Sequence, residues 1–228
     1  MKKGYRNGNV LGILFVTTML CCMAWSVAPV HAQNKVVVIP LTETVQLPYT
    51  GPPAPVPKTG QTTSYDPSYD DGYYEKGVAA PTPRFTDNGN GTVTDRLTGL
   101  IWLKNGNCTE FYSGDPNAGT NARPWAAAVT SAHQLRSGYC GLTDGSTDGS
   151  WLLPNRKELA SLIDLGQYNP ALPPDCPLEA TTVASYYWSA TTYALYPGNA
   201  WLVYFYNGDD NVHDKSNDYY VRAVRGGQ

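Results

Sequence analysis

The sequence predicts an α+β domain over residues 84–228, built from two helices and antiparallel strands. Two segments with helical periodicity lie in the middle of this region, and strand-like segments precede and follow them. Five of the six tryptophans fall in the same region, whose length suits one domain around one hydrophobic core. Because a proline-rich stretch without apolar periodicity comes before it, the domain is expected to start near Arg84.

The first predicted element is a hairpin in the segment DNGNGTVTD, from Asp87 to Asp95. Its two Asn-Gly pairs supply the positive φ angles that a tight turn requires. A phosphate-binding loop would need a lysine after its glycines and a helix behind them. An EF-hand loop would need oxygen ligands at two positions that Gly89 and Gly91 occupy. The segment is therefore interpreted as a turn between two strands.

Two helices are predicted from their end signals. The first has Pro124 in its opening turn and Gly138 after its end. The second starts at Asn155, which forms a capping box with Glu158, and ends at Gly166. The side chains expected to face the core are Trp125, Val129, Ala132 and Leu135 in the first helix and Leu159, Leu162 and Ile163 in the second.

Strands are predicted on both sides of the helices. In AWLVYFY both alternating sets of side chains are largely apolar or aromatic, as expected for a strand inside a sheet. The acidic segment GDDNVHDKSND that follows is interpreted as a turn. Arg222 and Arg225 are expected to pair with carboxylates, with an anionic ligand as the alternative partner of Arg225. The predicted strand segments are LIWLK, SWLLP, YYWSATTY, AWLVYFYNG and YYVRAVRGG.

Residues 1–32 have the layout of a secretory signal peptide, with Lys2, Lys3 and Arg6 before an apolar run and a small-residue cleavage site near Ala32. A transmembrane anchor is the alternative, which the short, threonine-interrupted run disfavours. Cleavage implies a secreted or periplasmic protein without a membrane span. It also leaves 13 of the 16 basic residues against 19 acidic ones, a net charge of −6. Because no basic run is present, no nucleic-acid partner is expected.

Residues 33–83 are predicted to form a disordered, proline-rich linker, with nine prolines between positions 40 and 83. Three cysteines follow the signal peptide: Cys108, Cys140 and Cys176. An oxidising compartment favours one disulfide and one leftover thiol. Of the three pairings, Cys108 with Cys140 is favoured because these two flank the first helix, and three reduced, buried thiols are the alternative.

Four ordered segments carry a family likeness: RFTDNGNGTVTDRLTGLIWLKNGNC, WLLPNRKELASLID, YWSATTYALYPGNAWLVYFYNG and YYVRAVRGG. Together they resemble the DUF1566 family, also called the Lcl C-terminal domain family after a collagen-like bacterial surface adhesin. The likeness covers residues 84–228. The last segment also resembles the end of formylglycine-generating-enzyme-like domains, which implies a C-type-lectin-like fold.

The adhesin member of the family implies glycan binding, including binding of sulfated glycans. Two departures argue against sulfated ligands here. The family usually reads Trp-Arg-Leu-Pro where this chain has Leu152 in place of the arginine, and residues 84–228 contain 10 basic and 14 acidic residues. No collagen-like Gly-X-Y tract precedes the domain, so the resemblance does not imply trimerisation by that route.

Catalytic motifs are missing from the sequence. It contains no GxSxG and no HExxH, and after the signal peptide only His133 and His213 remain as histidine bases. The protein is therefore expected to be non-catalytic and to need no cofactor. Calcium is the alternative, because the segment 208–218 is rich in carboxylate and amide oxygens. The candidate calcium ligands are Asp209, Asp210, Asn211, Asp214 and Asp218.

Aromatic side chains are the other functional signal, since sugar rings stack on aromatic faces and pockets combine such faces with a few polar groups. The leading hypothesis is an exported, adhesin-like module that binds a glycan or a surface ligand. The second is a structural envelope domain that binds a protein partner, and a hydrolytic enzyme comes last. The candidate ligand-binding residues are Tyr193, Tyr196, Asn199, Tyr206 and Arg225.

Overall fold

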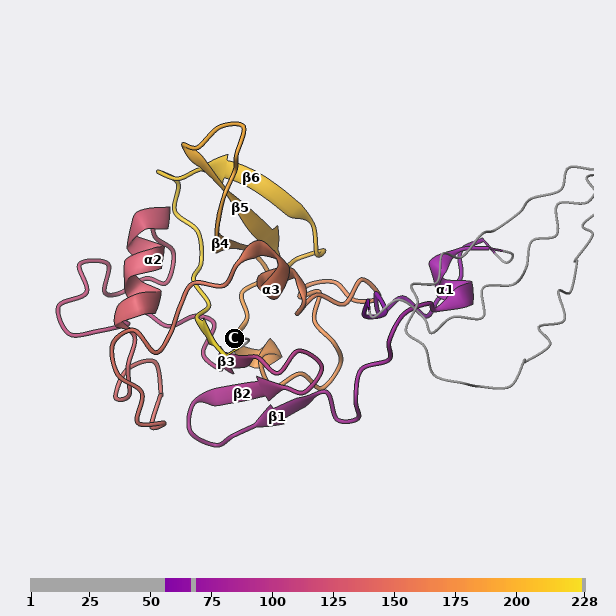
Figure 1. Ribbon diagram of the computed structural model, residues 1–228, viewed down its shortest axis with the longest axis horizontal. Helices are drawn as coiled ribbons and strands as arrows, with labels where there is room; N and C mark the ends of the chain where they lie inside the picture. The colour runs from indigo at the N-terminus through magenta and orange to yellow at the C-terminus, as the bar shows by residue number, and fades with distance from the viewer. Residues whose placement is uncertain (1–55, 67–68, 227–228) are drawn as a thin grey trace, which may run out of the picture. The chain divides into compact units, whose positions relative to one another are not determined.

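The computed structural model describes residues 56–66 and 69–226. They belong to one compact unit, Thr50–Gln228. The expected signal peptide and the linker residues up to 55 lie outside the described residues. Figure 1 shows the elements: α1 (Asp71–Tyr74), β1 (Phe85–Asp87), β2 (Thr92–Asp95), β3 (Ile101–Leu103), α2 (Trp125–Gln134), α3 (Arg156–Ala160), a 3₁₀ turn (Glu179–Thr181), β4 (Tyr186–Thr192), β5 (Asn199–Tyr204), β6 (Asp210–Asp214) and β7 (Val224–Arg225).

The strands form two sheets, ordered β1-β2-β3-β7 and β4-β5-β6, and their neighbours pair antiparallel. The predicted combination of antiparallel strands with two main helices is confirmed, and the described chain has more strand than helix. None of the helices in its described part has the length and apolar character that a membrane crossing requires.

The predicted entry hairpin is present as β1 and β2, with Phe85 opposite Asp95. Gly89 and Gly91 have φ angles of 72° and 84°, as the Asn-Gly pairs indicated. A Cβ atom on Gly91 would lie 2.3 Å from the carbonyl oxygen of Gly141. The second glycine is therefore required both by the turn and by its close approach to the loop that follows α2.

Both predicted helices form, but the second is shorter than expected. The Asn155 side chain accepts hydrogen bonds from the backbone of Lys157 and Glu158, at 2.9 and 3.0 Å, and the Glu158 side chain accepts one from the Asn155 amide. This capping box confirms the predicted start of α3. The helix ends at Ala160 instead of continuing to Gly166, and the turn that follows still buries Leu162 in the core.

The β4-β5-β6 sheet is buried on both faces in its middle. Trp188 lies opposite Leu202, and both belong to the hydrophobic cluster that includes residues of α2. Tyr187 lies opposite Val203, and both belong to the cluster that includes Leu159 of α3. Since side chains alternate along a strand, each face contributes to a different part of the core. Outside this buried middle, the ends of the sheet and its edge strand β6 are open to solvent.

Two strand predictions need correction. The segment SWLLP forms no strand and contributes a single bridge between Leu152 and Val224, because Leu152 is exposed and Pro154 cannot donate to a ladder. Conversely, the acidic segment interpreted as a turn contains β6, whose Val212 lies opposite Trp201. Pairing with the apolar strand β5 overrides the low strand propensity of aspartate and asparagine.

The expectation of a disordered linker is wrong for residues 56–66 and 69–80, here called the strap. The Asp70 carboxylate accepts a hydrogen bond from the Tyr73 amide at 2.9 Å and thereby caps α1. Pro57 pairs with Val78 in a parallel bridge. Local capping and this bridge order the segment in spite of its prolines.

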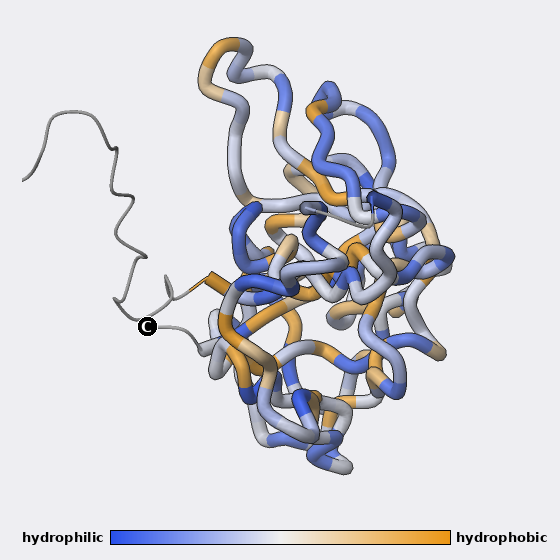
Figure 2. Tube along the Cα trace, turned by 90° about the vertical axis from the view of Figure 1, so that its right-hand side faces the viewer, coloured by the Kyte–Doolittle hydropathy of each residue, from blue (hydrophilic) through white to orange (hydrophobic). Residues whose placement is uncertain are grey.

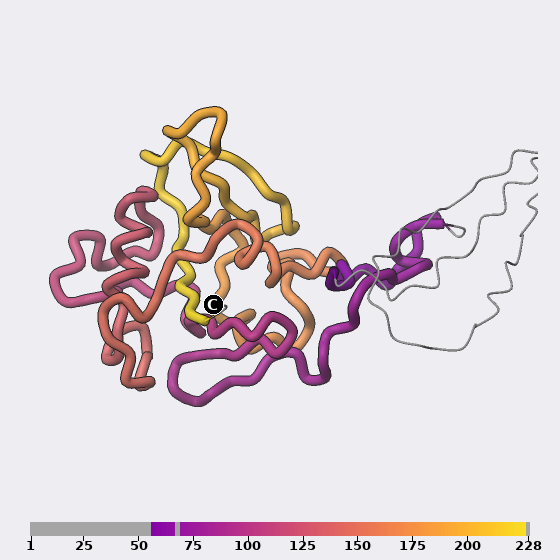
Figure 3. Tube along the Cα trace, in the orientation of Figure 1, coloured from indigo at the N-terminus to yellow at the C-terminus, as the bar shows by residue number. Residues whose placement is uncertain are grey.

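The strap also contacts the domain. The Leu165 amide donates to the carbonyl oxygen of Thr59 at 2.8 Å, and Figure 3 lets the reader follow the indigo chain to the loop after α3. A Cβ atom on Gly60, whose φ is 91°, would lie 2.1 Å from Asp164 Oδ1. Glycine is therefore required where the strap meets the domain.

The favoured disulfide is present. Cys108 and Cys140 are bonded with an S–S distance of 2.01 Å, and Cys176 is a free, buried thiol. Burial raises the pKa of Cys176, so the thiolate is disfavoured. The expected ion pair of Arg225 is also present, with Nη1 2.7 Å from Asp144 Oδ2.

No carboxylate among the described residues pairs with Arg222. This buried guanidinium donates instead to the carbonyl oxygen of Leu103 at 3.0 Å and to the Thr182 hydroxyl at 2.5 Å. Its Nε has no hydrogen-bond partner among the described residues, and burial lowers its pKa. Carbonyl oxygens at the end of β3 take the place of a carboxylate, because the last segment runs beside that strand.

Candidate functional site

Two groups of aromatic side chains lie at opposite ends of β5. The hairpin cluster consists of Tyr193, Leu195, Tyr196 and Trp201, at the connection between β4 and β5. Leu195 and Tyr196 are 66% and 61% exposed, and Figure 2 shows the hydrophobic tip of this topmost loop. An apolar tip that is open to solvent indicates a contact surface.

The geometry of the hairpin cluster leaves ring surface free. The ring of Tyr193 meets Trp201 edge-on at 5.5 Å between centroids and Tyr196 at 6.0 Å with a 49° tilt. The Asn199 amide donates to the Tyr196 carbonyl, and the Tyr193 amide donates to the Asn199 carbonyl, both at 2.9 Å. These bonds close the hairpin, and no ring in the described residues stacks face to face on Tyr196.

The base of the hairpin cluster carries a positive charge that is already neutralised. The Arg156 guanidinium lies 4.0 Å over the Trp201 ring. Its Nε donates to Asp210 Oδ2 at 2.7 Å, across from α3 to the start of β6. Because this carboxylate offsets the arginine, the cluster has little preference for anionic ligands.

The second group is the tyrosine stack, which lies at the other end of β5. Tyr186 and Tyr204 lie directly opposite each other on β4 and β5, with ring centroids 4.1 Å apart and nearly parallel planes. Tyr206 stacks on Tyr204 at 5.7 Å. Tyr168, which is 75% exposed, meets the ring of Tyr206 at 6.5 Å and 62°. Most ring faces in this row are therefore used by neighbouring rings.

The inner end of the tyrosine stack is polar. The Tyr219 hydroxyl and His213 Nδ1 are hydrogen-bonded at 2.6 Å, and both rings also contact Tyr186. Burial, followed by the neighbouring Tyr186, raises the pKa of Tyr219 above its ordinary value. The Tyr219 hydroxyl therefore stays protonated at neutral pH.

The five predicted ligand-binding residues do not form one site. Tyr193, Tyr196 and Asn199 come together in the hairpin cluster. Tyr206 belongs to the tyrosine stack. Arg225 is on β7, where it pairs with Asp144 and lies 4.9 Å over the Trp151 ring. The Arg225 guanidinium is therefore already neutralised by a carboxylate inside the domain.

The five predicted calcium ligands are not gathered either. Asp210 pairs with Arg156, and Asp214 accepts a hydrogen bond from the Ser216 amide at 2.8 Å, which lowers the pKa of Asp214. Asp209 accepts one from the Asn207 side chain at 2.6 Å. Within residues 56–66 and 69–226, no three His, Cys, Asp or Glu side chains are arranged to hold a metal ion.

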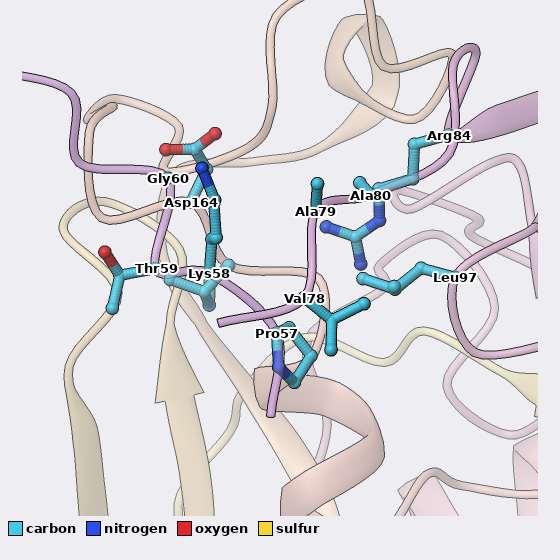
Figure 4. A pocket seen from close by; sticks show the side chains of 11 residues that line it. Pro57, Lys58, Thr59, Gly60, Val78, Ala79, Ala80, Arg84, Leu97 and Asp164 are labelled. Carbon is cyan, nitrogen blue, oxygen red and sulfur yellow. The ribbon is translucent and has the colours of Figure 1, made fainter. Parts of the chain in front are cut away.

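A small cavity of about 190 Å³ lies between the strap and the domain, lined mainly by apolar side chains such as Val78, Leu97 and Ile163. Figure 4 shows Arg84 and Asp164 on its walls. Arg84 pairs with Asp95, and Asp164 accepts a hydrogen bond from the Gly166 amide. Because Arg84 and Asp164 are already engaged, and Lys58 on the same wall pairs with Glu75, the cavity offers mainly apolar surface.

Several residues of the two groups could not be selected from the sequence. Trp201 and Tyr204 looked like core residues because their strand is aromatic on both faces, yet both are only half-buried. Arg156 carried no signal, since its partners come from β5 and β6. The exposed Tyr168 was hidden in an irregular loop. Only the alternation of Tyr204 and Tyr206 along the strand indicated that these two share a face.

No curated protein matches the sequence. The model of the Lcl C-terminal domain family matches residues 91–225, which is more than half of the chain. The matched region includes the Cys108–Cys140 disulfide, the two aromatic groups and every strand of both sheets except β1. The chain therefore belongs to the Lcl C-terminal domain family.

Proposed function

We propose that this chain is an exported binding module, C-type-lectin-like in architecture, whose hairpin cluster recognises a neutral glycan. The observation that carries this proposal is the exposed ring of Tyr196 beside the apolar tip residue Leu195. Sugar rings present flat faces of C–H groups, which pack on free aromatic faces. The two antiparallel sheets with long loops support the lectin-like architecture, and the signal-peptide layout of residues 1–32 supports export.

Charge favours a neutral ligand over a sulfated one. Arg156 is the cation nearest to the cluster rings, and its ion pair with Asp210 already satisfies it. A sulfate group would have to compete with that carboxylate, and it would approach a chain whose expected net charge after cleavage is −6. Polar groups for sugar hydroxyls are at hand on the same strand, where Asn199 lies opposite Asp214.

The test is an array of neutral and sulfated glycans, probed with the protein that is purified after export. The proposal predicts retention of at least one neutral glycan and a tenfold or larger loss of affinity in Tyr196→Ala, since one stacking contact contributes on the order of 1.4 kcal/mol. Tyr168→Ala is the matched control, because it removes another exposed tyrosine that lies outside the cluster. If no glycan binds, or if Tyr196→Ala binds as tightly as the wild type, the proposal is wrong.

A further inference from the structure

We propose that the tyrosine stack is a second binding surface, which takes an extended, proline-rich peptide carrying basic residues. This surface lies at the opposite end of β5 from the hairpin cluster, so it is independent of glycan binding there. Four features carry the proposal: the angles between the rings, their free hydroxyl groups, the exposed carboxylates beside them that form no ion pair, and the spacing of the rings.

The ring angles create a notch at the outer end of the stack. Tyr186, Tyr204 and Tyr206 stack on one another, so most of their ring faces are covered. Tyr168 is inclined at 62° to Tyr206 and both rings are exposed, whereas at the inner end His213 and the buried Trp188 contact Tyr219. A flat sugar face cannot pack on ring edges, whereas a compact pyrrolidine ring fits between two inclined aromatic rings.

The hydroxyl groups match a peptide that offers carbonyls without amide donors. Within the described residues, the hydroxyls of Tyr168, Tyr186, Tyr204 and Tyr206 have no hydrogen-bond partner, while that of Tyr219 bonds to His213. A phenol hydroxyl readily donates to a carbonyl oxygen. In a polyproline II helix the backbone makes no internal hydrogen bonds, so its carbonyl oxygens are free to accept.

Carboxylates beside the stack supply the preference for basic residues. The carbonyl of Asp209 accepts a hydrogen bond from the Tyr204 amide at 2.8 Å, and Asp218 directly precedes Tyr219. Both aspartates are exposed, and neither takes part in an ion pair among the described residues. Charge complementarity therefore selects lysine or arginine in the peptide over glutamate or aspartate.

The spacing of the rings suits an extended ligand. Successive centroids from Tyr168 to Tyr186 are 6.5, 5.7 and 4.1 Å apart. A polyproline II helix advances about 3.1 Å per residue with three residues per turn, so a peptide of about five residues covers this row. Its conformation is largely formed before binding, which lowers the entropy cost that a flexible peptide would incur.

The experiment titrates the full chain with three synthetic peptides of equal length. The first repeats Pro-Pro-Lys three times, which places every lysine along one edge of the helix. The second repeats Gly-Gly-Lys, with the same charge on a flexible chain. The third repeats Pro-Pro-Glu, with the same conformation and the opposite charge. We expect at least tenfold tighter binding of the Pro-Pro-Lys peptide than of either control peptide.

Variants then locate the binding. Tyr206→Ala and Tyr168→Ala should each weaken binding of the Pro-Pro-Lys peptide fivefold or more, and Tyr196→Ala in the hairpin cluster should leave it unchanged. All three side chains are exposed, so the folded state should survive, which a thermal melt checks. Equal binding of the two lysine peptides would reduce the effect to nonspecific charge attraction. That result, no binding at all, or full binding by both stack variants would overturn the proposal.

Discussion

The hairpin cluster and the tyrosine stack lie at the two ends of one strand, and both are rich in aromatic side chains. Their ring packing differs. In the hairpin cluster the loop holds Tyr193 edge-on to Trp201 and leaves Tyr196 open. In the stack, direct cross-strand pairing of Tyr186 with Tyr204 closes the ring faces against each other. Aromatic content alone therefore does not define a ligand, because the exposed part of each ring decides what it can bind.

The strongest destabilisation is expected at the hairpin end. Trp201→Ala removes the ring that Arg156 and Tyr193 contact, and it should lower the free energy of unfolding by about 2 to 3 kcal/mol. Chemical denaturation measures this loss. Glycan binding should disappear while binding of the Pro-Pro-Lys peptide persists. Tyr196→Ala, which removes an exposed ring, should change stability by less than about 0.5 kcal/mol.

A smaller loss of stability is expected at the tyrosine stack. Tyr204→Ala removes the middle ring of the stack, which is half-buried and contacts both Tyr186 and Tyr206. The expected cost is about 1 to 2 kcal/mol, from lost burial and lost ring stacking. Denaturant titration of Tyr204→Ala beside Tyr206→Ala separates the central ring from the terminal one. An equal loss of unfolding free energy in both variants would show that the middle ring stabilises the fold no more than the terminal ring.

Alkaline pH should weaken the stack end through ionisation of Tyr219. The pKa of Tyr219 is raised above 10.0 by burial and by Tyr186. The stability that its neutral form contributes is therefore complete below pH 10 and is lost as the pH rises through the folded pKa. Melting temperatures of the wild type and Tyr219→Phe, compared between about pH 9 and 11, measure this contribution. The variant should lose less stability over that range, although Tyr187 titrates in both proteins.

Acid should produce the smallest effect, at the hairpin end. Hydrogen bonds from the Ser216 amide and side chain lower the pKa of Asp214 below 3.8. Its contribution to stability is therefore present above pH 3.8 and is lost as the pH falls through the folded pKa. An Asp214→Asn variant should show a flatter dependence of melting temperature on pH below about 5 than the wild type. If melting temperature depends on pH in the same way in both proteins, the Asp214 carboxylate contributes no stability.

Local signals in the sequence were sufficient for several elements. The Asn-Gly pairs predicted the entry hairpin, and the pair Asn155 and Glu158 predicted the start of α3, because turns and caps depend on residues a few positions apart. The ordered strap escaped prediction although its signals are also local. The nine prolines between positions 40 and 83 outweighed the capping carboxylate of Asp70 in that interpretation.

Patterns in the chain were enough to predict the class of the domain, its family, its disulfide and the many aromatic residues near its end. Which of these rings meet, and which of their faces stay open, depends on the folded arrangement. The tertiary structure also decided that β6 forms from polar residues, that Arg222 bonds to carbonyl oxygens and that Arg225 pairs with Asp144. The physical reason is that these outcomes depend on strand register and on partners far apart in the chain, which no local pattern encodes.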